Sequence, residues 1–310
     1  MADAALSATG LDPTAIPPPP TTGTGTQPAP ETTPFTHPPP FHLSLNPAQP
    51  TTLLLLHGLL SSHLEYTHVI PHLSAYHLLL VDLPGHSNSF SASTPPLPQS
   101  YTLPSMADAL APLIRTHAHN GRAHVVGLSM GGYVALELAR RHPDLCCSVW
   151  VTGAAPLGGL FAWMAARPAW VDGFMWAVEV LPERVYEWMV GMQGMRPHRE
   201  VRGEMKRNRR WEVLYGVYGS ILEGEGGWER VGAVDGRVRV LTVAGGKQDD
   251  VEATRRMGRV WREMGREGCK AAVVREAVHA WDLQMPELFA EGVKAWVEGR
   301  ELPGEFELLE

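Results

Sequence analysis

Residues 123–132 read AHVVGLSMGG, and this stretch decides how the whole chain is interpreted. An apolar run at 123–126 leads into the sequence GLSMG at 127–131, and a segment of helix length follows until Pro143 stops it. A G-x-S-x-G sequence between a strand and a helix makes a sharp turn, whose flanks must be glycine because a side chain there would collide with the neighbouring strand and helix. The turn exposes the serine hydroxyl beside a helix N-terminus, where developing negative charge is favoured. We therefore predict that Ser129 is a nucleophile.

Apolar runs of strand length recur on both sides of this motif. Such runs, when they do not alternate with polar residues, are typical of strands buried on both faces of a parallel sheet. Segments of helix length, such as residues 105–119, lie between them. The alternation predicts an α/β fold with a doubly wound, mostly parallel sheet. The runs occupy residues 51–56, 77–81, 148–151 and 238–243.

One interval, residues 158–227, interrupts this alternation. It contains no convincing strand, and it is rich in methionine and tryptophan. Helices of this composition normally serve to cover apolar surface, and helices over a sheet also form the roof of an apolar pocket. We expect an inserted helical cap at 158–227 and an α/β core at 41–157 and 228–310. Six of the ten tryptophans lie in this interval or directly after it: Trp163, Trp170, Trp176, Trp188, Trp211 and Trp228.

The N-terminal part of the chain differs in composition from the rest. Residues 1–40 consist largely of Pro, Thr, Ala and Gly, and we predict a disordered, Pro-rich tail because such a segment cannot bury enough apolar surface to fold. Residues 1–114 contain no Lys or Arg, so the formal net charge of −7 belongs mainly to them. The remainder is nearly neutral, and the basic run at 196–210 is interpreted as a solvated helix face. We therefore expect no nucleic-acid partner.

Cysteine usage and hydropathy bear on the cellular compartment. The three cysteines are an odd number with two adjacent, which indicates a reducing environment. No apolar run approaches the ~18 residues that a membrane span needs, and the N-terminus lacks the pattern of a signal or transit peptide. The spacing of the histidines fits no metal site. We expect a cytoplasmic protein without a membrane span, a metal or another cofactor.

Four motifs together make the chain resemble a known superfamily. They are the His57-Gly58 pair after one apolar run, the sequence DLPGHS at 82–87 after the next, the serine turn, and His279 placed seven residues before Pro286. With these motifs, residues 41–300 resemble the α/β-hydrolase superfamily, in its esterase, lactonase, C–C hydrolase and epoxide hydrolase branch. Epoxide and haloalkane hydrolases have an aspartate at the nucleophile position, so Ser129 argues against both. Before the first long apolar run, only residues 41–45 are available for a strand. We therefore expect the sheet to lack the first strand or two of the usual sheet of this superfamily.

The resemblance implies a triad in the order nucleophile, acid, histidine. His279 would be the general base that removes the proton of the serine hydroxyl. The acid would lie in the loop AGGKQDDVE at 244–252. Counting along the loop favours Asp249, but Asp249 and Glu252 resemble a capping box, which would occupy the Asp249 carboxylate with backbone N–H groups. We therefore prefer Asp250 and keep Asp249 as the alternative.

The resemblance also implies an oxyanion hole built from backbone N–H groups. These would belong to Leu59, just after His57-Gly58, and to Met130, just after the nucleophile. For Asp82 and His86 it implies a structural role, in which their loop holds the turn below the serine.

The predicted function follows from the triad and the cap. We expect a serine hydrolase that cleaves an ester, lactone or thioester of an apolar substrate through an acyl-enzyme. A C–C bond hydrolase or an acyltransferase would use the same three residues. A ligand receptor without catalytic activity is a third alternative, because a fold does not determine a function. The oligomeric state is not indicated.

Overall fold

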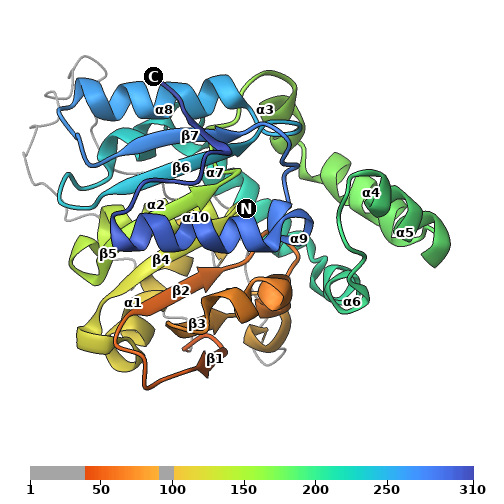
Figure 1. The fold of residues 1–310 in the computed structure, drawn as a ribbon. Coiled ribbons are helices and arrows are strands. Elements are labelled where there is room, and N and C mark those ends of the chain that lie inside the picture. Colours follow the sequence, from red (N-terminus) through yellow and green to blue (C-terminus); the bar gives the residue numbers. More distant parts are fainter. Residues whose placement is uncertain (1–38, 91–100) are drawn as a thin grey trace, which may run out of the picture. The chain divides into compact units, whose positions relative to one another are not determined.

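The computed structural model describes residues 39–90 and 101–310, so nearly all of the predicted tail at 1–40 lies outside the described residues. Its strands form one sheet in the order β1-β3-β2-β4-β5-β6-β7-β8 (Figure 1). β2 to β7 are parallel, whereas β1 and β8 pair antiparallel at the two edges. The predicted doubly wound, mostly parallel sheet is confirmed. The strands are β1 His42–Leu45, β2 Thr52–Leu56, β3 His77–Val81, β4 Ala123–Leu128, β5 Cys146–Thr152, β6 Val240–Gly245, β7 Lys270–Val274 and β8 Phe306–Leu308.

Side chains of the central strands are buried on both faces of the sheet. In β2, Leu54 and Leu56 belong to one apolar cluster, and Leu53 and Leu55 belong to another. This division follows from the geometry of a strand, in which successive side chains point to opposite faces. It also explains why the sequence of β2 is a continuous run of leucine rather than an alternating pattern.

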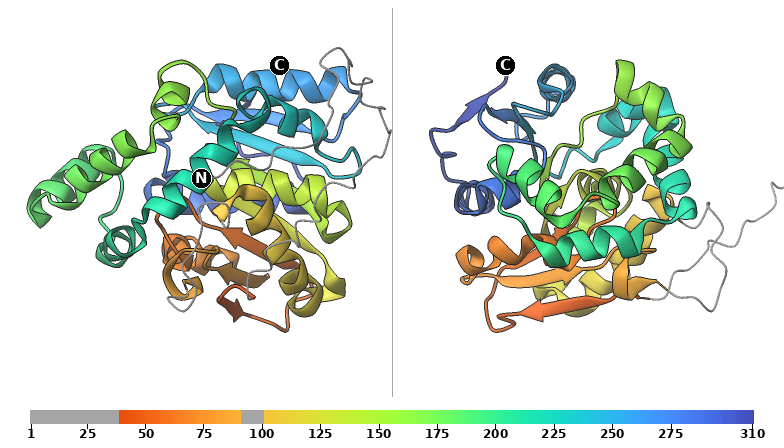
Figure 2. Two further views of the ribbon diagram at one scale, coloured as in Figure 1. Left: turned by 180° about the vertical axis from the view of Figure 1, so that it is seen from behind. Right: turned by 90° about the vertical axis from the view of Figure 1, so that its right-hand side faces the viewer.

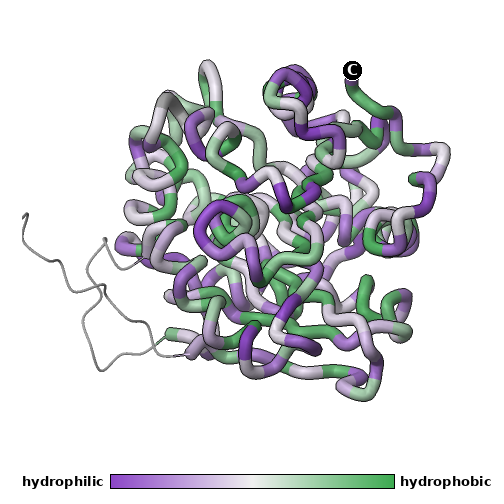
Figure 3. Tube along the Cα trace, turned by 90° about the vertical axis from the view of Figure 1, so that its left-hand side faces the viewer, coloured by the Kyte–Doolittle hydropathy of each residue, from purple (hydrophilic) through white to green (hydrophobic). Residues whose placement is uncertain are grey.

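Helices cover both faces of the sheet. The first cluster contains apolar residues of α1 Leu103–His117, α2 Met130–Arg141 and α8 Val251–Glu263, and the second contains residues of α10 Pro286–Glu298. Figure 1 shows α10 across one face, and the left view of Figure 2 shows α1 and α2 on the opposite face. In Figure 3 the helices alternate between hydrophobic and hydrophilic residues, as expected for helices with one buried side.

Five helices are inserted between β5 and β6. They are α3 Gly159–Ala165, α4 Pro168–Glu179, α5 Glu183–Met192, α6 Arg199–Asn208 and α7 Trp211–Ala233. α7 crosses the boundary that we expected at residue 227, and its residues Val213, Val217 and Val231 belong to the same cluster as α1 and α2. The predicted division between cap and core therefore falls within α7, where Gly224 and Gly227 have φ of +64° and +98°. Among the described residues, no helix is long and apolar enough to cross a membrane.

The parallel strands bring the predicted site residues together. Ser129 follows β4, the loop with His57 follows β2, and the loop of residues 246–250 follows β6. The carboxyl ends of parallel strands lie at one edge of a sheet, where ligands bind in open α/β folds. A short helix, α9 Trp281–Gln284, comes directly after the loop that contains His279.

Candidate active site

Ser129 occupies a strained turn between β4 and α2. Its φ of 52° and ψ of −118° lie in a region that side-chain-bearing residues rarely adopt. A Cβ atom at Gly127 would lie 2.3 Å from the carbonyl oxygen of Gly131, and one at Gly131 would lie 2.0 Å from the carbonyl oxygen of Leu56. Both flanking positions therefore require glycine, for the steric reason that the sequence indicated.

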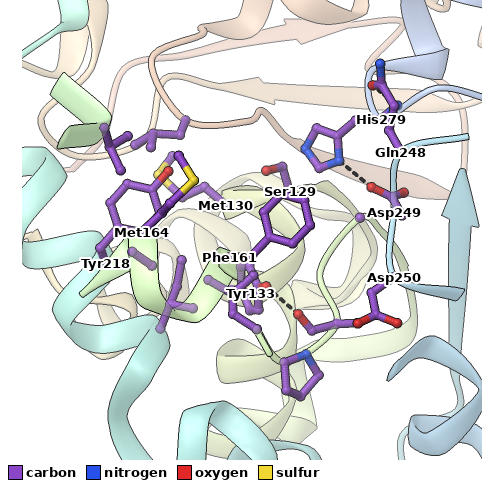
Figure 4. Close-up of a pocket in the computed structure, with 18 of the residues that line it drawn as sticks. Ser129, Met130, Tyr133, Phe161, Met164, Tyr218, Gln248, Asp249, Asp250 and His279 are labelled. Carbon is purple, nitrogen blue, oxygen red and sulfur yellow. Dashed lines mark hydrogen bonds and ion pairs between the residues drawn. The ribbon is translucent and has the colours of Figure 1, made fainter. Parts of the chain in front are cut away.

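The Ser129 side chain lines a cavity of about 710 Å³. In Figure 4, Ser129 and His279 lie next to each other at this cavity, and Asp249 lies on the other side of the imidazole ring from Ser129. Among the described residues the Ser129 hydroxyl has no hydrogen-bond partner, which leaves it available to a ligand. Hydrogen bonds between a catalytic nucleophile and its base are often long until a substrate binds.

His279 is held by Asp249 rather than by Asp250. Its Nδ1 donates to Asp249 Oδ1 at 2.5 Å, and the other Asp249 oxygen accepts the Gly245 N–H at 2.7 Å. The preference for Asp250 as the residue that orients His279 is therefore wrong. α8 begins at Val251, so Asp250 is its N-cap residue and accepts the Ala253 N–H at 2.8 Å. The capping role that we expected for Asp249 belongs to its neighbour.

The hydrogen bond to Asp249 also determines the protonation of His279. Burial alone would lower the pKa of His279, but the hydrogen bond and the negative charge of Asp249, together with Asp282, outweigh it and raise the pKa. An ionised carboxylate can only accept, so Nδ1 carries the proton and Nε2 is left as the basic nitrogen. His279 N–H donates in addition to Gln248 Oε1 at 2.9 Å, which fixes the loop as well as the ring.

Gly153, at the end of β5, leaves space for the imidazole ring. It has a φ of +62°, and a Cβ atom there would lie 2.6 Å from His279 Cε1 and 2.8 Å from Nδ1. The sequence showed a glycine after this strand but gave no reason to connect it with His279. That connection requires β5, β6 and the His279 loop to be placed side by side.

Leu59 and Met130, the predicted oxyanion donors, both line the cavity. Met130 is the first residue of α2, and N–H groups in the first turn of a helix have no intrahelical acceptor. Leu59 lies between two residues whose backbone N–H groups donate hydrogen bonds to side chains. Gly58 N–H donates to Glu65 Oε2 at 2.6 Å, and Leu60 N–H donates to His86 Nε2 at 3.2 Å.

Two buried histidines support the loop that carries Leu59. His57 Nε2 accepts the Leu83 N–H at 2.9 Å, and its Nδ1 lies 2.7 Å from the Gly58 carbonyl oxygen. Burial lowers the pKa of His57 to about 4 and that of His86 to about 3. Both rings are therefore neutral at neutral pH, and each keeps one nitrogen as an acceptor for a backbone N–H. This arrangement agrees with the structural role expected for His86.

Asp82 is fully buried and is occupied by hydrogen bonds. Its carboxylate accepts from the backbone N–H and Nδ1 of His63 at 2.9 and 2.7 Å, and from the backbone and side chain of Asn88 at 3.1 and 2.9 Å. Burial alone would raise the pKa of Asp82, but the bonds from His63 lower it to about 2. Every contact holds the loop after β3 in place, as expected for a structural aspartate.

A pair of buried carboxyl groups, Glu65 and Asp282, was not found by sequence reasoning. Burial raises the pKa of Asp282 to about 7, and burial together with the charge of Asp282 raises the pKa of Glu65. Neither carboxyl oxygen of Asp282 has a hydrogen-bond partner among the described residues. Glu65 lies in the 3-10 helix η1 His63–His68, which packs on α9. The pair therefore lies between the Gly58 loop and the segment after His279.

One sequence signal pointed to this pair. Glu65 is one of only six acidic residues in the first 114, and it lies close to the His57-Gly58 motif. Asp282 lies three residues after His279. Their pairing could not be predicted because the two positions are far apart in the chain.

The walls of the cavity are mainly apolar and come from the inserted helices. α3 supplies Phe161 and Met164, α4 supplies Phe174, and α7 supplies Tyr218 and Ile221 (Figure 4). Cavities of this size and lining are typical of sites for small organic ligands. In residues 39–90 and 101–310, no group of three or more His, Cys, Asp or Glu side chains is arranged to hold a metal ion.

Comparison with known proteins adds to this geometry. The sequence profile of a family described as alpha/beta hydrolase fold matches residues 51–236, more than half of the chain. An AB hydrolase superfamily protein of Gibberella zeae is 28% identical over 274 residues, 87% of this chain and 87% of that protein. A pimeloyl-(acyl-carrier protein) methyl ester esterase of Aeromonas hydrophila is 29% identical over 161 residues, 51% of this chain and 59% of that enzyme. A solved structure of a thermophilic esterase from Thermogutta terrifontis is 20% identical, has a TM-score of 0.60, and matches 84% of this chain and 93% of its own.

Proposed function

The chain belongs to the alpha/beta hydrolase fold family, and on that premise we propose that it is a serine hydrolase that cleaves an ester, lactone or thioester of an apolar substrate. One observation carries the proposal. His279, whose Nδ1 is bonded to Asp249, borders the same cavity as the strained Ser129 turn. A serine hydroxyl is a weak nucleophile until a base removes its proton, and this arrangement supplies the base and the group that orients it.

The proposed reaction has two halves. Ser129 Oγ attacks the acyl carbon while His279 Nε2 takes the hydroxyl proton, and the oxygen of the tetrahedral intermediate accepts hydrogen bonds from the Leu59 and Met130 N–H groups. The intermediate collapses when His279 gives that proton to the departing alcohol or thiol, which leaves an acyl-enzyme on Ser129. Water then attacks the acyl-enzyme, with His279 again taking and returning a proton, and the acid is released.

The lining of the cavity supports the substrate class. Its inner wall consists largely of side chains without charge from α3, α4 and α7, which suits an apolar acyl or alcohol group. Two proteins to which the chain is similar carry the word esterase in their names. A cytoplasmic location belongs to the same proposal, because all three cysteines are free thiols.

The test uses the full chain with a panel of p-nitrophenyl esters of increasing chain length and with a fluorophosphonate probe. We expect wild type to hydrolyse the esters and to be labelled by the probe, and Ser129→Ala to lose both, with turnover reduced by at least ~10³-fold. Full activity in Ser129→Ala would exclude this mechanism. Failure of the probe to label wild type would favour a ligand receptor.

Two further measurements separate the enzymes that share this triad. Product analysis with an added alcohol reveals acyl transfer, because the acyl group then appears on the alcohol rather than as free acid. Turnover of a vinylogous diketone without turnover of simple esters would identify a C–C bond hydrolase.

A further inference from the structure

The inserted helices α3, α4 and α5 follow one another in the chain (Figure 1). Large apolar side chains are exposed on all three. Ten of the 16 exposed large apolar residues in the described part of the chain lie within residues 160–192, and we call these ten the α3–α5 surface. Its most exposed tryptophans are Trp170 at 65% and Trp188 at 66%. We had expected the tryptophans of this region to cover apolar surface, but these rings face outward. Folded proteins rarely leave so many large apolar side chains together on a surface that binds nothing.

The α3–α5 surface is continuous with the cavity that contains Ser129. Phe161 and Phe174 line that cavity, and they are also 59% and 57% exposed. Val171 on α4 lines the cavity as well, whereas Trp176 on the same helix and Val180 directly after it are exposed. α4 is therefore apolar on the side that faces the cavity and also on a side that faces outward. Whatever covers the surface lies at the entrance to the cavity.

Two arginines beside the apolar side chains of these helices are not neutralised by an acidic residue of the described chain. All four acidic residues of α4 and α5 form ion pairs with arginines of α6 or the residue after it, whereas Arg167 and Arg184 have no carboxylate partner among the described residues. Both arginines are exposed. The four carboxylates share three arginines, so the two further arginines leave this group with one net positive charge, in a chain whose formal net charge is −7. The pairs are Asp172–Arg209, Glu179–Arg209, Glu183–Arg202 and Glu187–Arg199.

We propose that the α3–α5 surface binds to an anionic lipid bilayer. Exposed tryptophans are favoured at the depth of lipid headgroups, where the ring is apolar and the indole N–H remains hydrated. Unpaired arginines next to apolar side chains add attraction to anionic headgroups. A second copy of the chain would offer these arginines no free carboxylate from α4 or α5, because all four acidic residues of these helices already form ion pairs. Charge complementarity thus selects an anionic lipid surface as the partner.

This inference goes beyond the proposed hydrolysis, because binding to a bilayer does not require Ser129. It also gives the substrate a route. An apolar ester that partitions into the bilayer reaches the cavity past Phe161 and Phe174 without crossing water. The proposed enzyme would then act at the bilayer surface on molecules dissolved in the lipid.

Flotation of the full chain with vesicles tests the proposal. The vesicles contain phosphatidylcholine alone or phosphatidylcholine with phosphatidylglycerol. We expect wild type to float with the anionic vesicles and to float less as salt concentration rises, because salt screens the attraction. The double variant Trp176→Gln/Trp188→Gln, whose residues do not line the cavity, should reduce the fraction bound by ~10-fold.

Matched single variants keep the test informative if the double variant folds poorly. Met192→Gln on α5 should weaken binding several-fold, whereas Met264→Gln, an exposed methionine after α8, should not change it. Arg184→Gln should weaken binding to anionic vesicles but not to neutral ones. Arg262→Gln removes from α8 an exposed arginine that has no partner in the described part of the chain, and it should change neither.

Ser129→Ala separates this proposal from the hydrolase proposal. If Ser129→Ala floats like wild type, binding is independent of catalysis, and loss of activity then concerns the hydrolase proposal alone. Wild type that stays with the unbound fraction at every content of anionic lipid would overturn the inference. So would wild type that does not float but sediments as a dimer that Trp188→Gln converts to a monomer, because the surface would then be an interface between two copies.

Discussion

The α/β core and the inserted helices use the same residue type in opposite ways. In the core, Trp261 and Trp281 are fully buried, and their indole N–H groups donate to Val231 O at 3.0 Å and Thr152 Oγ1 at 2.8 Å. On α4 and α5, Trp170 and Trp188 are exposed. The core tryptophans hold strands and helices around the site, whereas the others are available to a partner.

One buried side chain of the inserted helices contacts two loops of the core. Asn208, at the end of α6, accepts the Ser87 N–H at 2.7 Å through its oxygen. Its nitrogen donates to Leu60 O at 3.1 Å and to Ser61 O at 2.8 Å. A residue of the inserted helices therefore holds the loop that carries Leu59.

The largest expected effect concerns the choice between adjacent carboxylates. Asp249→Asn should lower kcat by ~10³–10⁴-fold, because the amide no longer favours the tautomer with the proton on Nδ1. Asp250→Asn should change kcat by no more than a few-fold, because Asp250 caps α8. Initial rates on one ester measure both. Equal losses in the two variants would contradict the assignment of Asp249.

The interaction of Asp249 with His279 also predicts a pH dependence of the activity. Asp249 raises the pKa of His279, so the acidic limb of kcat/KM should lie above the ordinary histidine value and shift to lower pH in Asp249→Asn. The contribution of this pair to stability is fully present below the unfolded-state pKa of histidine. It is lost as the pH rises through the raised folded-state pKa.

The second largest expected effect is on the free energy of unfolding, and it distinguishes a buried tryptophan from an exposed one. Trp261→Ala should lower the free energy of unfolding by ~3–5 kcal/mol, because it leaves a cavity and an unpaired carbonyl at Val231. Trp188→Ala should change it by less than ~0.5 kcal/mol. Urea denaturation followed by circular dichroism measures both. A loss at Trp188 as large as that at Trp261 would show that the exposed ring is packed in the folded protein.

A smaller effect is expected where the two regions meet. Asn208→Ala should cost ~2–3 kcal/mol of unfolding free energy and should also lower kcat, because the loop next to Leu59 loses its anchors. Lys206→Ala, on the same helix but exposed and unpaired among the described residues, is the control and should leave both quantities unchanged. A stability loss with unchanged kcat would separate Asn208 from the oxyanion loop.

The smallest effect concerns the buried pair Glu65 and Asp282. Because the pKa of Asp282 is raised to about 7, the folded protein holds a proton that the unfolded chain releases at its ordinary pKa. Stability should therefore fall as the pH rises through this window, by ~2 kcal/mol from about pH 5 to about pH 8. Asp282→Asn should remove much of that dependence. Unfolding curves at several pH values measure it, and an unchanged slope in the variant would contradict the raised pKa.

The sequence by itself was sufficient for features that depend on neighbours in the chain. The Ser129 turn follows from a strand, two glycines and a helix start in consecutive positions. A Cβ atom at Gly127 would collide with the backbone of Gly131 in the same turn, whereas the collision at Gly131 involves Leu56 of the neighbouring strand. Buried strands were recognised because a continuous apolar run can be satisfied only between two apolar layers. His279 was recognised from a short local motif. The catalytic roles of these residues stay predictions.

Tertiary structure alone decided the features that depend on distant segments. Whether Asp249 or Asp250 faces His279 depends on the residue at which α8 begins relative to the His279 loop, and one residue changes the direction of the side chain. The partnership of Glu65 with Asp282 depends on how η1 packs on α9. The exposure of Trp170 and Trp188 depends on what lies next to α4 and α5. Burial is a property of the neighbours that the fold brings together, and a residue's own identity does not specify them.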